Sequence, residues 1–320
     1  MRRCGKFLAA HDGKLSIRAA DSADGKSIFI MGRMSRWVLA GSWPGRAGPR
    51  LSMRIRKGEL VSEVSSFTIR LSFHGDLAFF LKSKAGNKIV ERRLGEKTSV
   101  KDVIESCGVP HPEIDLILVK GQPVDFSHIL EREQEIDVYP VQSQPTLFHE
   151  NRLQAKGIDR FIADGHLGKL ARDLRLLGFD VVYDRDAQDR QLLAVMEIDN
   201  RALLTRDRWL LMHKVVQHGY YPRSQDAAEQ TIEVMRRFDL FSAIAPFTRC
   251  LRCNALLEKV EKAEVMEKLE RLTRIHYEQF RRCTGCGQIY WPGSHFDKLR
   301  ARIEGIRAML AAESRSENQI

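Results

Sequence analysis

Two closely spaced cysteine pairs constrain the fold of this 320-residue chain more than any other feature. The pairs are Cys250/Cys253 and Cys283/Cys286; each has C-x-x-C spacing, and 29 residues separate them. Two such knuckles can present four thiolates to one tetrahedral Zn²⁺. Four cysteines complete the coordination sphere, so we expect a structural zinc rather than a catalytic one. A chance arrangement and redox-active pairs are the alternatives, and disulfides are disfavoured if the protein is cytoplasmic.

The residues around these cysteines allow both structural and binding roles. The spacer segment 258–272 alternates in charge and is expected to add a short helix. Flanking arginines either offset the negative charge of a zinc tetrathiolate or grip phosphate; they are Arg249, Arg252, Arg281 and Arg282. Nearby aromatic residues either form a small core, which we favour, or stack on exposed bases; they are Tyr290, Trp291 and Phe296. His295 is interpreted as a surface residue or an RNA contact, and Cys4 and Cys107 as free thiols.

The excess of positive charge lies near the N-terminus. Residues 1–65 contain 13 Lys and Arg against 5 Asp and Glu, whereas the whole chain has a net charge of +10. A solvated arm explains such a segment more often than a nucleic-acid reading surface does. We therefore interpret residues 1–65 as a basic, disordered extension, with Met53 as an alternative natural start.

Composition excludes several other classes of protein. Hydrophobic residues make up 43% of the chain and charged residues 29%, which excludes wholesale disorder, a collagen-like fibre and a small disulfide scaffold. No apolar run approaches the roughly 18–20 residues of a membrane-spanning helix. Asp12 and Lys14 interrupt the apolar stretch that a secretory signal would need. We expect a cytoplasmic protein without a membrane partner, and no pattern indicates an oligomeric state.

Residues 66–142 have the pattern of one small α+β domain. Strands are expected at 66–73, 88–94, 114–119 and 135–141, from alternating or continuous apolar residues. Ser99 is placed to cap a helix that ends before Gly108, and a turn is expected at 121–123. The order β-β-α-β-β resembles a ubiquitin-like β-grasp domain, most closely the sulfur-carrier branch. Those carriers end in a free Gly-Gly tail, but here the segment continues as YPVQSQPT, so a docking or structural module is expected.

After a polar linker at 143–157, strands and helices alternate through residues 158–248. Apolar runs predict strands at 158–163, 179–183 and 201–205. Leucines spaced by three and four residues predict an amphipathic helix over 166–178, ended by Gly178. Further helices are expected over 191–198 and 226–238. Short strand–helix–strand units of this kind indicate an α/β fold with a mostly parallel sheet and flanking helices.

Four aspartates occupy positions where such a fold binds ligands. Asp164 and Asp207 follow the carboxyl ends of predicted parallel strands, where ligands bind in open α/β sheets. Asp189 precedes the middle helix, and Asp226 begins a later one. Four converging carboxylates would repel one another without a cation, and their oxygens suit Mg²⁺ or Mn²⁺. Each aspartate alone is more often a structural cap, so the interpretation depends on the set.

Phosphate binding is expected next to this acidic set. Lys169 and Arg172 lie on the helix after Asp164, where they could hold a phosphate backbone. One or two bound cations could activate a water molecule and stabilise the leaving oxygen of a phosphodiester.

A family resemblance makes these expectations more specific. The stretch FIADGHLGKLARDLRLLGFDVVYD, then RALLTRD, then the cysteine pairs and YWPGSH, resembles the Mut7-C ribonuclease domain over about residues 158–300. That family belongs to the PIN-like nucleases, and the segment before it resembles the ubiquitin-like module often fused there. The resemblance implies a PIN-like fold, metal dependence and an RNA substrate. It places Asp164 and Asp207 in the site.

The other two acidic positions have rivals nearby. The resemblance assigns Asp189 as the second acid, with Asp184 and Asp186 close to it, and Asp226 as the fourth, with Glu229 as its alternative. Without Asp226, single-ion chemistry is expected.

Two functions from different classes follow. The first is a Mg²⁺- or Mn²⁺-dependent ribonuclease that uses Asp164, Asp189, Asp207 and Asp226. The second is a non-catalytic RNA- or protein-binding module that docks through the β-grasp domain and the zinc ribbon. In either case we expect the PIN-like domain over 158–248, the zinc ribbon over 249–300 and a C-terminal helix or tail over 301–320.

Overall fold

The computed structural model describes residues 66–81, 88–141, 145, 148 and 150–317, together with four short strands within the first 39 residues. The chain divides into two compact units, residues 1–62 and 63–320. In the first unit the strands form an antiparallel sheet that the sequence did not predict; they are β1 (Leu8–His11), β2 (Lys14–Arg18), β3 (Phe29–Met31) and β4 (Val38–Leu39). Most of the predicted N-terminal extension, including Cys4 and Met53, lies outside the described residues.

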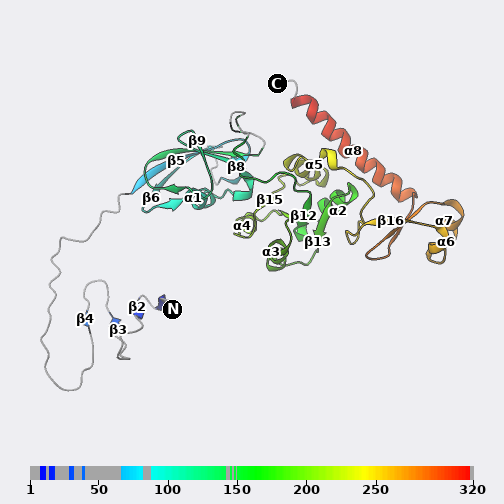
Figure 1. The fold of residues 1–320 in the computed structure, drawn as a ribbon, viewed down its shortest axis with the longest axis horizontal. Coiled ribbons are helices and arrows are strands. Elements are labelled where there is room, and N and C mark those ends of the chain that lie inside the picture. The colour runs from blue at the N-terminus through cyan, green and yellow to red at the C-terminus, as the bar shows by residue number, and fades with distance from the viewer. Residues whose placement is uncertain are drawn as a thin grey trace, which may run out of the picture. The chain divides into compact units, whose positions relative to one another are not determined.

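The second unit begins with a mixed five-stranded sheet of β-grasp type (Figure 1). Its strand order is β6-β5-β11-β8-β9, in which the central pair β5 and β11 is parallel and the other pairs are antiparallel. The strands are β5 (Phe67–Phe73), β6 (Ile89–Leu94), β8 (Ile114–Val119), β9 (Gln122–Val124) and β11 (Gln134–Pro140). A short pair joins β7 (Thr98–Ser99) to β10 (Ile129–Leu130).

Helix α1 (Val100–Ser106) packs its apolar side into the core of this sheet. Ser99 caps the helix as predicted, because its hydroxyl oxygen accepts a hydrogen bond from the backbone N–H of Asp102 at 3.1 Å. The expected turn at 121–123 is shorter than predicted, since Gln122–Val124 pairs with β8. Two 3-10 turns complete the domain, η1 (Leu77–Phe80) and η2 (His111–Glu113).

A four-stranded parallel sheet follows, in the order β13-β12-β14-β15. Its strands are β12 (Arg160–Ala163), β13 (Asp180–Tyr183), β14 (Ala202–Leu204) and β15 (Gly219–Tyr220). The connecting segments hold η4 (Gly165–Leu167), α2 (Gly168–Leu176), α3 (Asp189–Ile198), α4 (Arg208–Leu211), α5 (Ala227–Arg237) and η5 (Phe241–Ala243). The predicted α/β class with a parallel sheet is therefore confirmed.

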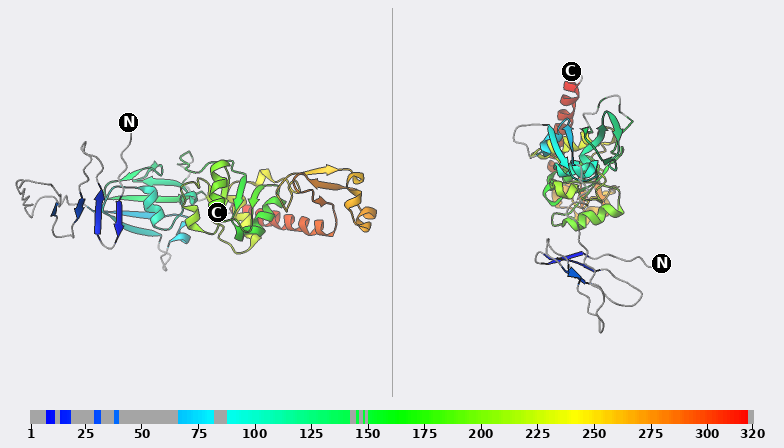
Figure 2. Two further views of the ribbon diagram at one scale, coloured as in Figure 1. Left: turned by 90° about the horizontal axis from the view of Figure 1, so that it is seen from below. Right: turned by 90° about the vertical axis from the view of Figure 1, so that its left-hand side faces the viewer.

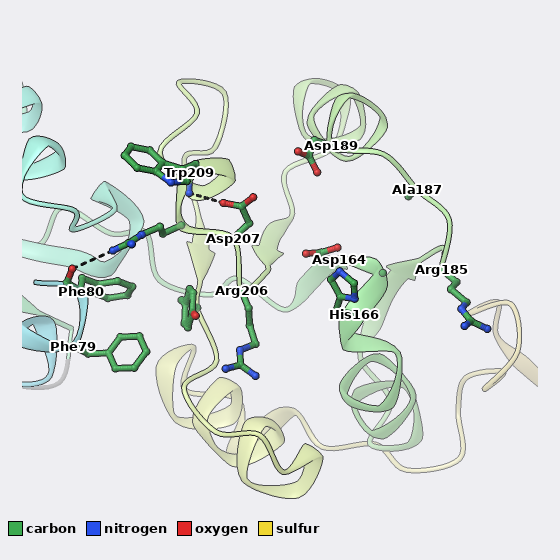
Figure 3. Close-up of a pocket in the computed structure, with 13 residues that line it drawn as sticks. Phe79, Phe80, Asp164, His166, Arg185, Ala187, Asp189, Arg206, Asp207 and Trp209 are labelled. Carbon is green, nitrogen blue, oxygen red and sulfur yellow. Dashed lines mark hydrogen bonds between the residues drawn. The ribbon is translucent and has the colours of Figure 1, made fainter. Parts of the chain in front are cut away.

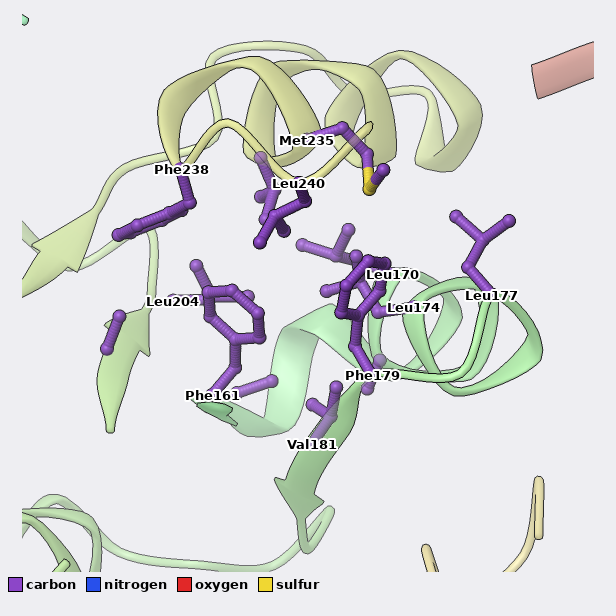
Figure 4. Close-up of a cluster of buried hydrophobic side chains, with 14 of the residues drawn as sticks. Phe161, Leu170, Leu174, Leu177, Phe179, Val181, Leu204, Met235, Phe238 and Leu240 are labelled. Carbon is purple, nitrogen blue, oxygen red and sulfur yellow. The ribbon is translucent and has the colours of Figure 1, made fainter. Parts of the chain in front are cut away.

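Alternate strand residues enter hydrophobic cores on opposite faces of the sheet. Phe161 and Leu204 face the core formed with α2 and α5, which Figure 4 shows. Ile162 and Leu203 face a second core that includes residues of α3 and α4. Helix α2 ends at Leu176, and Gly178 follows its C-cap as the predicted stop, with a φ of 105° that suits glycine.

The C-terminal part combines a small antiparallel sheet with a long helix (Figure 2). The sheet order is β16-β17-β18, and its strands are β16 (Leu257–Val260), β17 (Phe280–Cys283) and β18 (Ile289–Tyr290). The charged spacer forms α6 (Lys262–Val265), η6 (Met266–Lys268) and α7 (Arg271–His276), which confirms the expected helical insertion. Helix α8 (Ser294–Glu317) starts before residue 301 and packs Ile303 and Ile306 against the core beside α2.

An ion network at the amino ends of the parallel strands joins this sheet to the ribbon. The Asp180 carboxylate accepts from Arg201 Nη1 at 2.6 Å and from Asn254 Nδ2 at 2.8 Å. Arg249 lies 3.3 Å from the second oxygen of Asp180. Burial raises the pKa of Asp180, but these hydrogen bonds and positive charges outweigh burial and lower it overall.

No helix in the described part of the chain is both long and hydrophobic enough to span a lipid bilayer.

Candidate active site

A cavity of about 770 Å³ opens at the carboxyl ends of β12 and β14 (Figure 3). Its lining residues come from both the α/β domain and the β-grasp domain. They are Phe79, Phe80, Asp164, Gly165, His166, Arg185, Ala187, Asp189, Arg206, Asp207, Arg208, Trp209 and Tyr221. The position agrees with the rule that open α/β sheets bind ligands beyond the carboxyl ends of their strands.

Asp164 and Asp207 face this shared cavity from neighbouring strands. Asp164 directly follows β12, and its Oδ2 accepts a hydrogen bond from the Thr205 hydroxyl at 2.8 Å. Asp207 follows β14 and caps α4, because its Oδ1 accepts from the backbone N–H of Trp209 at 2.8 Å. Thr205 also accepts from the backbone N–H of Asp207 at 3.0 Å, so one hydroxyl links both positions. These bonds hold both aspartates in place and leave carboxylate oxygens directed into the cavity (Figure 3).

Asp189 completes a group of three carboxylates on the cavity wall. It is the first residue of α3 and is exposed, and Figure 3 shows its side chain pointing toward Asp164 and Asp207. Within the described residues, no ion pair neutralises any of the three. Their donor atoms are too dispersed to form a compact ligand set, since the only such set among the described residues is made of cysteines. A Mg²⁺ ion does not require such a set, because it commonly uses one or two carboxylates and fills its other positions with water and substrate phosphate.

The structure does not bring three further predicted residues into the cavity. Asp226 caps α5, where its Oδ1 accepts from the backbone N–H groups of Glu229 at 3.2 Å and Ala228 at 2.8 Å; these hydrogen bonds lower its pKa. Lys169 and Arg172 are exposed on α2, and neither lines the cavity. The lining residues of this segment are Asp164, Gly165 and His166, all of which precede α2.

The sequence analysis named none of the remaining lining residues as part of the site. His166 and Arg206 lie within two residues of the predicted aspartates, so adjacency to an acid was a usable signal. Phe79 and Phe80 belong to η1 of the β-grasp domain, more than 80 residues upstream of Asp164. No local pattern connects them to the acids.

The four cysteines form a compact metal-ligand set. Their sulfur atoms all lie within 4.8 Å of one another, with Sγ–Sγ distances of 3.7 Å for Cys250–Cys286 and 3.3 Å for Cys253–Cys283. Burial raises the pKa of Cys250, but hydrogen bonds from Tyr290 and from backbone N–H groups lower it to about 6. A thiolate is thus favoured at Cys250, whereas burial raises the pKa of Cys283 to about 12. This donor set can bind a structural zinc ion.

The knuckle turns and the nearby side chains support a structural role for this region. Asn254 and Gly287 follow the two pairs with φ of 74° and 69°, the left-handed conformation expected of tight knuckles. Tyr290 bonds Cys250, and Phe296 packs on Phe247 with ring centroids 4.5 Å apart, whereas Trp291 is partly exposed. His295 is exposed, and Cys107, outside the set, is a buried free thiol.

The flanking arginines make contacts of their own. Arg249 bonds the carbonyls of Gly178 and Asn254, and Arg281 bonds that of Phe247. Arg282 pairs with Glu258.

Comparison with known families assigns both domains of the second unit. Residues 159–303 match the Mut7-C RNAse domain, and residues 66–145 match the Mut7-C ubiquitin family. None of the curated proteins matches the chain. The predicted resemblance is therefore confirmed: the chain carries a Mut7-C RNAse domain preceded by a Mut7-C ubiquitin-like domain.

Proposed function

We propose that the chain is a Mg²⁺- or Mn²⁺-dependent ribonuclease that hydrolyses RNA phosphodiester bonds in the cavity at the end of the parallel sheet. One observation carries the proposal. Asp164, Asp189 and Asp207 share that cavity without a cationic partner among the described residues, inside a region that matches an RNAse domain. A bound cation would reduce the repulsion between these carboxylates and the RNA backbone, which the arginines of the same lining also offset in part.

Different lining residues would bind the metal and the RNA substrate. Asp164, Asp189 and Asp207 would hold the cation, which would supply Lewis-acid stabilisation of the phosphate. Thr205 and the first turn of α4 keep two of these carboxylates in fixed positions. The lining arginines Arg185, Arg206 and Arg208 supply positive charge for the RNA backbone. We leave Asp226 out of this set because it does not line the cavity.

Substitution of Asp207 tests the proposal. Asp207→Asn keeps an oxygen that can cap α4 but removes the charge, so the fold and zinc content should persist while cleavage falls by at least roughly 100-fold. The assay follows 5′- and 3′-labelled single-stranded RNA with added Mn²⁺ or Mg²⁺. Asp125→Asn is the matched control, because Asp125 also accepts a backbone N–H, at 2.8 Å from Ser127, but lies in the β-grasp domain outside the cavity lining.

The outcomes separate the two functions. Cleavage by Asp207→Asn at the wild-type rate would reject the site. Wild-type protein that binds RNA with either metal but cuts none would favour the non-catalytic binding module. Loss of cleavage in Asp226→Asn would extend the acidic set to α5.

A further inference from the structure

The cavity has an aromatic wall that combines residues of both domains. Phe79 and Phe80 come from the β-grasp domain, while Trp209 and Tyr221 come from the RNAse domain. Phe79 is 52% exposed and Trp209 is 66% exposed. Figure 3 shows Phe79, Phe80 and Trp209 on one side of the cavity, with Asp164 and Asp189 on the other.

Neighbouring side chains pack against part of the Phe79 ring and leave the rest exposed to solvent. Its ring centroid lies 5.2 Å from that of Phe80 and 5.4 Å from that of Tyr221. The guanidinium of Arg223 lies 5.8 Å from the Phe79 ring and 5.0 Å from the Phe80 ring. Phe80 itself is buried, and its carbonyl oxygen accepts from Arg208 at 3.3 Å. An exposed aromatic ring fixed in this way is a ready stacking surface.

Positive charge lies beside these rings. The guanidinium of Arg206 lies 5.9 Å from the Tyr221 ring, and that of Arg208 lies 5.9 Å from the Trp209 ring. Arg206 bonds the neutral side chain of Gln225. Within the described residues, neither arginine forms an ion pair with a carboxylate. Their charge is therefore available to phosphate groups, and cations alternating with exposed aromatic rings are typical of surfaces that bind single-stranded nucleic acid.

We propose that the β-grasp domain forms part of the substrate site, and that Phe79 and Trp209 stack on unpaired bases of single-stranded RNA. This inference rests on the proposed ribonuclease function, because it deepens that site. Arg206 and Arg208 bind the phosphates next to the stacked bases, and the strand continues toward the acids. Duplex RNA cannot use this wall, since its bases are already stacked on one another.

Equilibrium binding without added Mg²⁺ or Mn²⁺ tests the inference independently of cleavage. The full chain is titrated against a fluorescein-labelled 12-nucleotide single-stranded RNA and against the same strand annealed to its complement. Phe79→Ala and Trp209→Ala should each raise the Kd for the single strand by roughly 5- to 150-fold. Neither should change the Kd for the duplex. Phe79→Tyr should bind the single strand as wild type does, because it keeps the ring.

Phe241→Ala is the matched control, since Phe241 is a 43% exposed phenylalanine outside the cavity lining. Circular dichroism verifies that each variant is folded. If Phe79→Ala does not fold, Trp209→Ala alone tests the aromatic wall. The inference is overturned if the Phe79 and Trp209 variants lose no more affinity than Phe241→Ala, or if they lose as much for the duplex as for the single strand. A chain that binds as expected but cuts no RNA would refute the proposed function and leave the stacking wall standing.

Discussion

Arg223 joins the two domains at the base of the aromatic wall, and its removal should destabilise the whole second unit. Its Nη2 lies 2.8 Å from Oε2 of Glu113, a residue of η2 whose side chain is only 2% exposed. The same nitrogen lies 3.0 Å from the exposed Asp76. Burial lowers the pKa of Arg223, but the nearby Glu113 carboxylate more than compensates and raises it. The guanidinium therefore stays charged.

The magnitude follows from what Arg223→Met leaves behind. Removing one partner of a buried ion pair costs about 3–5 kcal/mol, because the other charge stays buried. Glu113 keeps one hydrogen bond, from the backbone N–H of Tyr221 at 2.6 Å, which places the cost in the lower half of that range. Loss of the ring contacts adds about 1 kcal/mol and loss of the exposed Asp76 pair less than that. We expect the free energy of unfolding to fall by about 4–6 kcal/mol.

Urea denaturation, followed by circular dichroism and tryptophan fluorescence, measures this change. Glu113→Gln in the Arg223→Met background removes the unpaired buried charge but keeps an oxygen that accepts the backbone N–H of Tyr221. The double variant should therefore recover at least about 1 kcal/mol relative to Arg223→Met alone. A loss below 1 kcal/mol in Arg223→Met, or a double variant less stable than the single one, would refute the reasoning.

Three further predictions concern the zinc ribbon, the ion network and the end of α2. Metal analysis should find about one zinc per chain, lost in Cys250→Ser and retained in Cys107→Ser, which alters a buried thiol outside the set. Because the folded-state pKa of Asp180 is lowered, its stabilisation is present above pH about 4 and is lost as the pH falls through the folded pKa. Asp180→Asn should therefore flatten the acid limb of a stability-versus-pH curve, and an unchanged limb would contradict this assignment. Gly178→Ala should lower the free energy of unfolding by at least about 1 kcal/mol in urea titrations, because φ is 105° and a Cβ would clash with the backbone oxygen of Ala245. Wild-type stability would show that the loop shifts to accommodate the Cβ.

Local patterns in the sequence anticipated most of the second unit. Alternating apolar residues located β5, a short apolar run located β12, leucine spacing located α2, and Ser99 and Gly178 marked helix ends. These features depend on residues within a few positions of one another, where backbone geometry alone sets the periodicity. The antiparallel sheet of the first unit was missed although Lys14–Arg18 alternates polar and apolar residues, because its strands span only two to five residues.

The sequence by itself determined the cysteine set and the strand ends that carry Asp164 and Asp207, because both follow from short spacings and from the common direction of parallel strands. Only the tertiary structure decided which acids share a cavity: it grouped Asp189 with them and placed Asp226 on a separate helix cap. It alone brought Phe79 to the same cavity. The physical reason is that contacts between domains depend on packing and on buried pairs such as Arg223–Glu113, whose partners are 110 residues apart and leave no periodic trace in the chain.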